Sequence, residues 1–354
     1  MATEPDINVI EDAVTVYDNN PGQASTIAVI GAFDSTITAL TNVTTARAAH
    51  AAFGTTGTAG TFKGTDVIDF LFIGASNLLI ANITTWSEDS TPVASTTMTT
   101  EKLAAALNML HNQQFDLLFI ADELTDAQQT SVTTWLNGEH GNKFCHDQVI
   151  QLSKSSASAY TTSVATIGKC VAWVNTQTFG YYGTVLDLNR STALMAGYIA
   201  SLDVNRPLTA KIIPGITSVS PAYNTSAGEL GATLLSLNVP FLECRNTMTQ
   251  DYYCVNSMLP NGLDMYINRT RDYILNRIRV EPFLGDPNSE KTIEGIDNVV
   301  GGIVEECVDT LGLLKDVIYR IERVSATQAD VIIEKMVFDG VITRIDIHYS
   351  IEVQ

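Results

Sequence analysis

The chain has 354 residues and a mass of 38.3 kDa, and 45% of its residues are hydrophobic. This length suggests two or three domains, and the hydrophobic fraction is ordinary for a globular protein with a sizeable core. The charge balance is unusual, because 39 acidic residues against 20 basic ones give a formal net charge of −19. Nucleic acids and anionic membranes repel such a surface, so neither is expected as a partner.

Nothing in the sequence predicts a membrane span or a secretory signal. No stretch approaches the roughly 18 consecutive apolar residues that a membrane-spanning helix requires. The N-terminus, Met1 to Asp6, has acidic residues where a signal peptide has a basic region and an apolar run. We therefore expect the protein to be made and folded in a cytoplasm.

The five cysteines are Cys145, Cys170, Cys244, Cys254 and Cys307. They form no CxxC pair and their number is odd, which argues against a zinc site or a disulfide framework. Cys307 falls on the apolar stripe of a predicted helix and is expected to be a small core residue. Cys244 and Cys254 are the pair expected to bond under oxidising conditions, which the lack of a secretory signal disfavours.

Charge density rises near residue 265. The last 90 residues carry 10 basic and 16 acidic side chains, whereas residues 1–264 carry 10 and 23. This change follows the turn signal Pro260-Asn261-Gly262 and marks the expected domain boundary. We expect an N-terminal arm and linker, an α/β core domain with a Thr-rich subdomain inserted or split around 35–95, a C-terminal α+β domain and a C-terminal arm strand. Their respective ranges are 1–24, 25–264, 265–340 and 341–354.

The start of the chain mixes strand-like and loop-like segments. Asp6–Ile10 and Val14–Tyr17 are typical of short strands, and Asp18–Gly22 is typical of a loop. Ser25–Gly31 is expected to be a buried strand. Residues 35–65 are rich in Thr, Ala and Gly and show little periodicity, so the sequence assigns no element there.

From residue 78 onwards, apolar runs of strand type alternate with helical segments. Thr125 and Gln128 form a capping-box pattern at the start of one predicted helix. The alternation predicts a mostly parallel sheet with helices on its faces. Strands are expected over 78–83, 115–120, 148–152 and 169–174, and helices over 101–111, 125–136, 158–168 and 191–202.

The last quarter of the chain has a different pattern. A helix is expected over 268–279 and a second one over about 289–312. The second helix carries the strongest apolar stripe in the chain, formed by Ile293, Ile296, Val300, Ile303, Cys307 and Leu311. Strands over 317–324 and 331–338 follow, and the turn dipeptide Asp339-Gly340 leads to a final strand over 341–353.

Both ends of the chain are strand-like segments outside the evident cores. The apolar positions of these segments are Ile7, Val9, Val14 and Val16 at the start, and Val341, Ile345, Ile347, Tyr349, Ile351 and Val353 at the end. Backbone groups of such strands need partners, and strand addition between subunits supplies them. Arms at both ends favour a polymer, because head-to-tail contacts propagate. The alternative is that the final strand pairs with 331–338 in its own domain.

The sequence gives only weak signals for a phosphate-binding loop and for a metal site. Gly57–Thr65 is the segment nearest to a phosphate-binding loop, but its lysine does not follow the second glycine and no helix is expected after it. A flexible surface loop is expected there instead, and the absence of G-x-G-x-x-G excludes a dinucleotide fold. His140 and His146 lie close to Cys145 and Asp147, but no second ligand group completes a metal site.

A serine hydrolase is the enzymatic alternative. Asp122, His140 and Ser226 follow the chain order of the subtilisin triad. That chemistry requires a serine strained at a helix start, with a histidine within hydrogen-bond reach. Ser226 lacks a flanking glycine and His140 has no helix after it. Asp122 is otherwise expected to be a loop or helix-capping acid.

Several segments in a fixed order carry a family resemblance. They are Pro5–Asp12, Ile27–Gly31, Ala196–Leu202 with Pro207–Thr209 and Ile213–Ile216, and Asn268–Arg279 with Glu281–Asn288. In this order, over the whole chain, they resemble the contractile tail sheath proteins of bacteriophages and related injection machines. The run from Ala196 to Ile216 is the most specific, and it is similar to the family's A-G-x-x-A and P-G-V run. The first segment, Pro5–Asp12, departs from the family pattern at Asp6, where glycine is usual.

This resemblance implies a structural function without catalysis or a cofactor. Sheath subunits form stacked hexameric rings around an inner tail tube, and their N- and C-terminal arms join a small sheet in neighbouring subunits. On triggering, the subunits rotate outward as nearly rigid bodies, and the shortening sheath drives the tube through a bacterial envelope. The implied fold has a subtilisin-like middle domain that is not known as a protease.

The resemblance also implies partners and a place in the particle. The partners are further copies of the chain, the inner tail tube protein, and baseplate and tail terminator proteins, in a virion tail or extracellular contractile particle assembled in the bacterial cytoplasm. The family uses a C-terminal helix against the tube, so the polar side of helix 289–312 is the candidate attachment surface. Its tube-facing candidates are Lys291, Glu294, Asp297 and Glu305. Another virion structural protein with similar arms is a further alternative.

Overall fold

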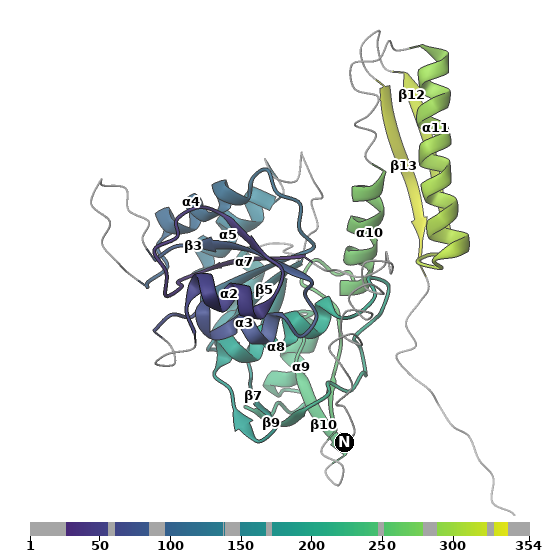
Figure 1. The fold of residues 1–354 in the computed structure, drawn as a ribbon. Coiled ribbons are helices and arrows are strands. Elements are labelled where there is room, and N and C mark those ends of the chain that lie inside the picture. Colours follow the sequence, from purple (N-terminus) through teal and green to yellow (C-terminus); the bar gives the residue numbers. More distant parts are fainter. Residues whose placement is uncertain are drawn as a thin grey trace, which may run out of the picture.

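The computed structural model describes most of the chain outside its two ends (Figure 1). The described residues are 26–55, 61–84, 96–136, 138, 149–167, 172–246, 251–278, 289–323 and 329–338. None of the helices in these ranges is both long enough and apolar enough to cross a membrane.

A six-stranded sheet lies at the centre of the main body, in the order β2-β3-β1-β4-β5-β6. All neighbouring strands are parallel except β2, which runs antiparallel to β3 at one edge. The mostly parallel sheet expected from the alternating pattern is therefore confirmed. The strands are β1 (Thr26–Gly31), β2 (Thr41–Val43), β3 (Asn77–Asn82), β4 (Leu117–Glu123), β5 (Val149–Ser153) and β6 (Ala172–Asn175).

Helices cover both faces of this sheet, which explains why its strands are continuously apolar. In β1, Ile27 and Val29 belong to one buried cluster, and Ala28 and Ile30 belong to the other. The first face is covered by α2 (Ala46–Phe53), α3 (Ile68–Leu71) and α8 (Leu188–Ala200). The second is covered by α4 (Thr100–Leu110), α5 (Asp126–Trp135), α7 (Ala157–Ile167) and α9 (Leu230–Ser236).

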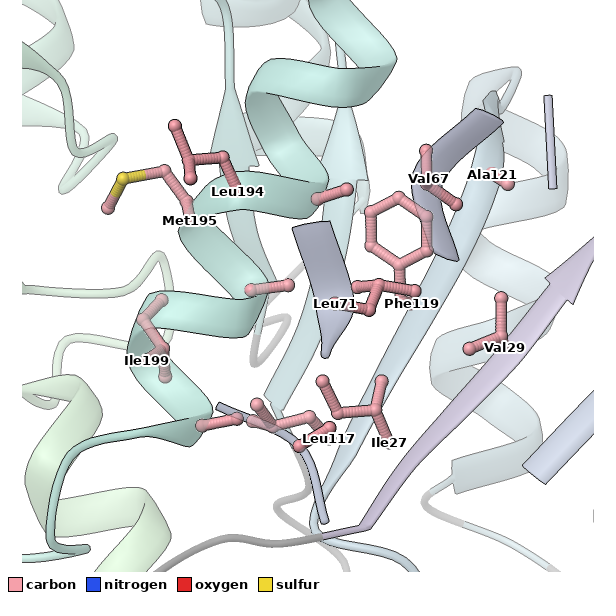
Figure 2. Close-up of a cluster of buried hydrophobic side chains, with 14 of the residues drawn as sticks. Ile27, Val29, Val67, Leu71, Leu117, Phe119, Ala121, Leu194, Met195 and Ile199 are labelled. Atoms are coloured by element: carbon pink, nitrogen blue, oxygen red, sulfur yellow. The ribbon is translucent and has the colours of Figure 1, made fainter. Parts of the chain in front are cut away.

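Figure 2 shows the first of these layers, in which α8 packs against β4. Leu194 and Ile199 of α8 belong to the same buried cluster as Phe119 of β4. The helix starts at its N-cap Asp187, whose side chain accepts a hydrogen bond from the backbone N–H of Arg190. The expected capping box of α5 is confirmed, with reciprocal bonds between Thr125 and Gln128.

The segment 35–65 differs from expectation. It contains β2, which joins the central sheet, and α2, whose N-cap residue Thr45 accepts a side-chain hydrogen bond from the N–H of Ala48. A short 3-10 helix, Thr65–Val67, and then α3 directly follow the segment 57–65, and Gly64 is buried. The expectation that no helix follows 57–65 was therefore wrong. The sequence assigned no element to 35–65, because small residues such as Ala49 pack here without a wide apolar stripe.

Glycines allow α8 to approach the end of α3 closely. A Cβ atom at Gly197 would lie 2.0 Å from the Phe70 carbonyl oxygen, and one at Gly74 would lie 2.2 Å from the Gly197 carbonyl oxygen. The glycine of the Ala196-Gly197 motif therefore has a packing reason. Gly215, in the second motif, has φ +80°, and a Cβ atom there would lie 2.6 Å from the Tyr181 ring.

Gly197→Ala is expected to lower the free energy of unfolding by at least about 2 kcal/mol, since the added methyl group meets backbone that cannot move aside easily. Gly302→Ala is the matched control, because a Cβ atom there would meet nothing within 4 Å. In the control, the better helix propensity is expected to raise stability by about 0.5–1 kcal/mol. Urea unfolding of both variants measures the difference, and equal effects would contradict this packing argument.

Two small antiparallel sheets lie beyond β6. One has the order β8-β7-β9, formed by β8 (Thr184–Val185), β7 (Thr178–Tyr181) and β9 (Ile216–Ser220). The other pairs β10 (Leu242–Asn246) with β11 (Asp251–Cys254). Cys244 lies opposite Tyr252 and Cys254 lies opposite Leu242, and both cysteines are free thiols. Cys145 and Cys170 lie outside the described residues.

The last elements form a C-terminal unit that extends from the main body (Figure 1). It contains α11 (Glu290–Glu305), a π-helical turn (Glu306–Thr310), β12 (Asp316–Arg323) and β13 (Ala329–Val337). The preceding helix α10 (Met265–Arg277) belongs to both parts. Its first residue, Met265, lies in the main core, whereas Ile274 packs with Val300 and Cys307. The expected core position of Cys307 is confirmed, since its exposure is 0%.

The start of α10 is fixed by a buried carboxyl group. Asp264 is the N-cap residue, its side chain accepts a hydrogen bond from the N–H of Tyr266, and the Ser257 hydroxyl lies 2.7 and 2.6 Å from its two oxygens. Burial raises the pKa of Asp264 above its ordinary value of 3.8, although these hydrogen bonds lower it. The protonated group therefore contributes stability that is full below pH 3.8 and is lost as the pH rises through the folded-state pKa.

Asp264→Asn is expected to be tolerated, because an amide oxygen accepts the same hydrogen bonds and no charge is buried. Relative to the wild type, the variant is expected to gain stability as the pH rises from about 4 to 7. Denaturant unfolding at several pH values measures this difference. A difference that shifts in favour of the wild type over that range would contradict the raised pKa.

Candidate functional site

The C-terminal unit is built as a two-stranded sheet on one helix. β12 and β13 pair antiparallel, with Val317 opposite Met336 and Ile321 opposite Val331. One face of the pair packs towards α11 in a cluster with Ile296 and Val300. Among the described residues, neither strand has a second neighbour in its sheet.

The outer face of this sheet carries charge. Arg320 Nε donates to Glu334 Oε1 at 2.8 Å, and Arg320 Nη1 donates to Glu322 Oε2 at 2.5 Å. Ile318 is also exposed there, at 44%. The register shifts between Ile318 and Tyr319, which leaves Glu334 without an opposite residue. The unit is thus closed on the helix side and open to solvent on the other side.

The predicted stripe of α11 faces inward, and the predicted polar side faces solvent. Ile296 and Val300 are buried, and Ile303 and Leu311 pack against the same cluster. The four candidates for tube contact are all exposed: Lys291, Glu294, Asp297 and Glu305. Their contact with a tube stays a prediction. Glu306 does not belong with them, because it is half-buried and bonded to α10.

A groove of about 570 Å³ runs between α11 and β12. Its lining residues are Glu290, Ile293, Glu294, Asp297, Ile321 and Arg323. Asp297 is fixed at the groove by the Tyr319 hydroxyl, which lies 3.1 Å from its Oδ1. Two of the candidates therefore share this groove, where three carboxylates lie beside apolar side chains.

An ion pair and a backbone contact hold the base of the C-terminal unit. Arg277 Nη2 donates to Glu306 Oε2 at 2.6 Å, and this hydrogen bond raises the pKa of Arg277. Asn205 Nδ2, in the main body, donates to the Gly312 carbonyl oxygen at 3.2 Å. Together with the shared helix α10, these contacts tie the unit to the main body.

The arm strands expected at the chain ends lie outside the described residues. This holds for Ile7, Val9, Val14 and Val16, and for Val341, Ile345, Ile347, Tyr349, Ile351 and Val353. His140, His146, Cys145 and Asp147, the weak metal pattern, also lie outside them. Within the described ranges, no group of three or more metal-ligating side chains is assembled.

A second cavity, of about 310 Å³, lies at the carboxyl ends of β4 and β5. Its acidic side chains have partners in the protein. Lys63 Nζ donates to Asp122 Oδ1, Arg190 lies 3.4 Å from Asp66, and the Ser155 hydroxyl donates to Glu123 at 3.0 Å. The network joins the ends of neighbouring strands to one another and to the start of α8.

Of the three hydrolase candidates, Asp122 and Ser226 lie among the described residues and His140 lies outside them. Asp122 accepts hydrogen bonds from Lys63 and from the backbone N–H of Glu123, as a loop acid would. Ser226 is exposed in the loop before α9, and its N–H donates to Asn224 Oδ1 at 2.9 Å. It does not lie at the start of a helix, which the chemistry requires.

Asp122→Asn is expected to lower the free energy of unfolding by about 1 kcal/mol, because the partly exposed Lys63 loses its charged partner. Ser226→Ala is expected to change it by less than about 0.5 kcal/mol, since the side chain is exposed. Urea unfolding measures both. A hydrolytic activity of the wild type that both variants abolish would instead favour the enzymatic alternative.

Comparisons with known proteins give one consistent result. No protein-family model matches the chain, and no curated protein matches it by sequence. The crystal structure of a sheath tail protein from Listeria innocua has a TM-score of 0.65 at 11% identity, over 94% of this chain and 99% of that one. The anti-feeding prophage helical sheath in its contracted state gives 0.64 at 13% identity, over 93% of each chain.

A chain of the anti-feeding prophage baseplate gives a TM-score of 0.68 at 12% identity, over 94% of each chain. These similarities extend over almost the whole of each protein. They show that the present chain has the fold of the sheath tail proteins.

Proposed function

We propose that this protein is the structural subunit of a contractile tail sheath, polymerising around an inner tail tube and contracting to drive that tube through a bacterial envelope. The observation that carries the proposal is the fold likeness over 94% of the chain, which includes the C-terminal unit. The motif order in the sequence supports it independently, because it points to the same family.

Assembly rests on the two arms. The pair β12–β13 has free edges among the described residues, and unpaired edges are templates for another strand. The N-terminal segment with Ile7 and Val16 and the C-terminal segment with Val341 and Val353 supply strands of suitable alternation. We infer that each arm adds to the β12–β13 sheet of a neighbouring copy, and that hexameric rings stack in this way.

Contraction follows from rigid bodies joined by extended links. The shared helix α10 and the ion pair between Arg277 and Glu306 couple the main body to the C-terminal unit. The segments around Asp18–Gly22 and Asp339–Gly340 then absorb the rotation of each subunit relative to its neighbours. The extended state is held by a kinetic barrier, and the contracted state buries more or better-matched surface.

The exposed side of α11 is the proposed tube contact. Lys291, Glu294, Asp297 and Glu305 are charged, and a contact made through them weakens with salt and releases during contraction. The other partners in this proposal are baseplate and tail terminator proteins. The subunit is assembled in the bacterial cytoplasm and belongs to a virion tail or an extracellular contractile particle.

The proposal assigns no catalysis. The subtilisin-like character of the core, which the family resemblance implies, is supported by the parallel sheet and by Asp122 at the carboxyl end of β4. The ion pair of Asp122 with Lys63 gives this residue a structural role.

Deletion of residues 342–354 is expected to leave a folded monomer that forms no rings or cylinders, because the copies lose a strand link. Electron microscopy and denaturant unfolding of the purified protein measure the two outcomes, and the full chain is expected to polymerise. A truncated chain that is unfolded would show that the last strand completes its own domain. One that still polymerises would show that the arm is not the link.

A matched pair of point variants separates the faces of the final strand. Ile347→Asp places a charge on the predicted apolar face, whereas His348→Asp places the same charge on the opposite face. The first is expected to block polymerisation, and the second is expected to leave it intact.

A further inference from the structure

The hairpin β7–β8 presents the two most exposed large apolar side chains among the described residues. Val185 is 76% exposed and Tyr182 is 74% exposed, whereas the other exposed large apolar residues lie between 40% and 44%. Single exposed apolar side chains are ordinary. Two neighbouring side chains with this degree of exposure, one in a two-residue turn and one in the strand that follows it, are not ordinary.

The backbone at Tyr182 adds a second, independent observation. Tyr182 has φ 45° and Gly183 has φ 82°, the positive values of a type I′ hairpin turn. Asn or Asp is favoured at the first of these positions, and an aromatic residue there is disfavoured. Tyr182 thus occupies a strained position and gains little burial from it. Such local conflicts are typical of functional positions.

Packing against neighbouring aromatic rings holds the ring of Tyr182 in place. It meets the Tyr181 ring at a centroid distance of 4.6 Å, and Tyr181 in turn meets Phe70 at 6.3 Å. The N–H of Tyr182 donates to the Gly215 carbonyl oxygen at 3.0 Å. A rigid aromatic side chain with its outer surface in solvent is the usual anchor of a protein interface.

The strands around this anchor carry no charged side chain of their own. No residue from 172 to 186 or from 212 to 228, which together include all of β7, β8 and β9, is acidic, basic or histidine. The chain as a whole has a net charge of −19. Two copies of so acidic a protein repel each other, so they come into close contact most readily through a neutral face.

We infer that the face formed by the β7–β8 hairpin and β9, with Tyr182 and Val185 as its exposed apolar side chains, docks against a second copy of this chain. This contact rests on the proposed function and adds a rigid interface to the links made by the arms. The three-stranded sheet lies at the end of the main body away from α11 (Figure 1).

The variant Tyr182→Asn with Val185→Ser tests the contact without harming the fold. Asparagine suits the turn better than tyrosine, so the free energy of unfolding of the monomer is expected to stay equal or rise. The critical concentration for polymerisation is expected to increase at least tenfold. Thr130→Asn, at an exposed position of α5, is the matched control and is expected to leave the critical concentration unchanged.

A photoreactive phenylalanine analogue at position 182 identifies the occupant. The expected product in assembled particles is a covalent adduct of two copies of this chain. An adduct with a different particle protein, or no adduct, would overturn the inference. So would a double variant that polymerises at the wild-type concentration, and in that case the proposed sheath function stands. A wild-type chain that never self-associates would overturn both.

Discussion

The backbone hydrogen bonds of β12 and β13 set the strongest constraint on this molecule. A strand offers a row of N–H and C=O groups on each side, and among the described residues each of these strands satisfies one row, against the other. α11 covers a face of the pair, not its edges, through Ile296 and Val300. A sheet of two strands is marginal alone. In the proposed assembly, the alternating segments at the chain ends of neighbouring copies supply additional strands to it.

In the proposed sheath, linked subunits transmit force only if each subunit is stiff, and the packing within the chain provides this stiffness. α10 is shared between the main core and the C-terminal unit, and its buried Arg269 donates to the Leu202 carbonyl oxygen at 2.9 Å. Burial lowers the pKa of Arg269 to about 10, although Asp116 and Asp203 raise it. Asp116 also accepts a hydrogen bond from the N–H of Thr26, where β1 begins. Asp116 therefore interacts both with the start of β1, where the N-terminal segment joins the core, and with α10, from which the C-terminal unit extends.

Much of the fold was predictable because its signals are local. The stripe of α11 and the capping box of α5 depend on neighbours within one helix turn, and the parallel sheet follows from the order of its elements. The α2 helix was missed because its short, Ala-rich sequence has no wide apolar stripe. The polar side of α11 was predictable, but the groove it shares with Ile321 was not. The burial of Arg269 and the exposure of Tyr182 were also not predictable, because they depend on elements that are distant in sequence.

Amide hydrogen–deuterium exchange over residues 316–323 and 329–337, in assembled particles and in the monomer, tests whether the edges of β12 and β13 gain strand partners on assembly. Free edge amides exchange quickly, and amides paired with a strand from another copy are protected. Exchange in these two segments is expected to slow at least tenfold on assembly. Equal exchange rates in the particle and the monomer would contradict this expectation, because the edges would then have gained no partner.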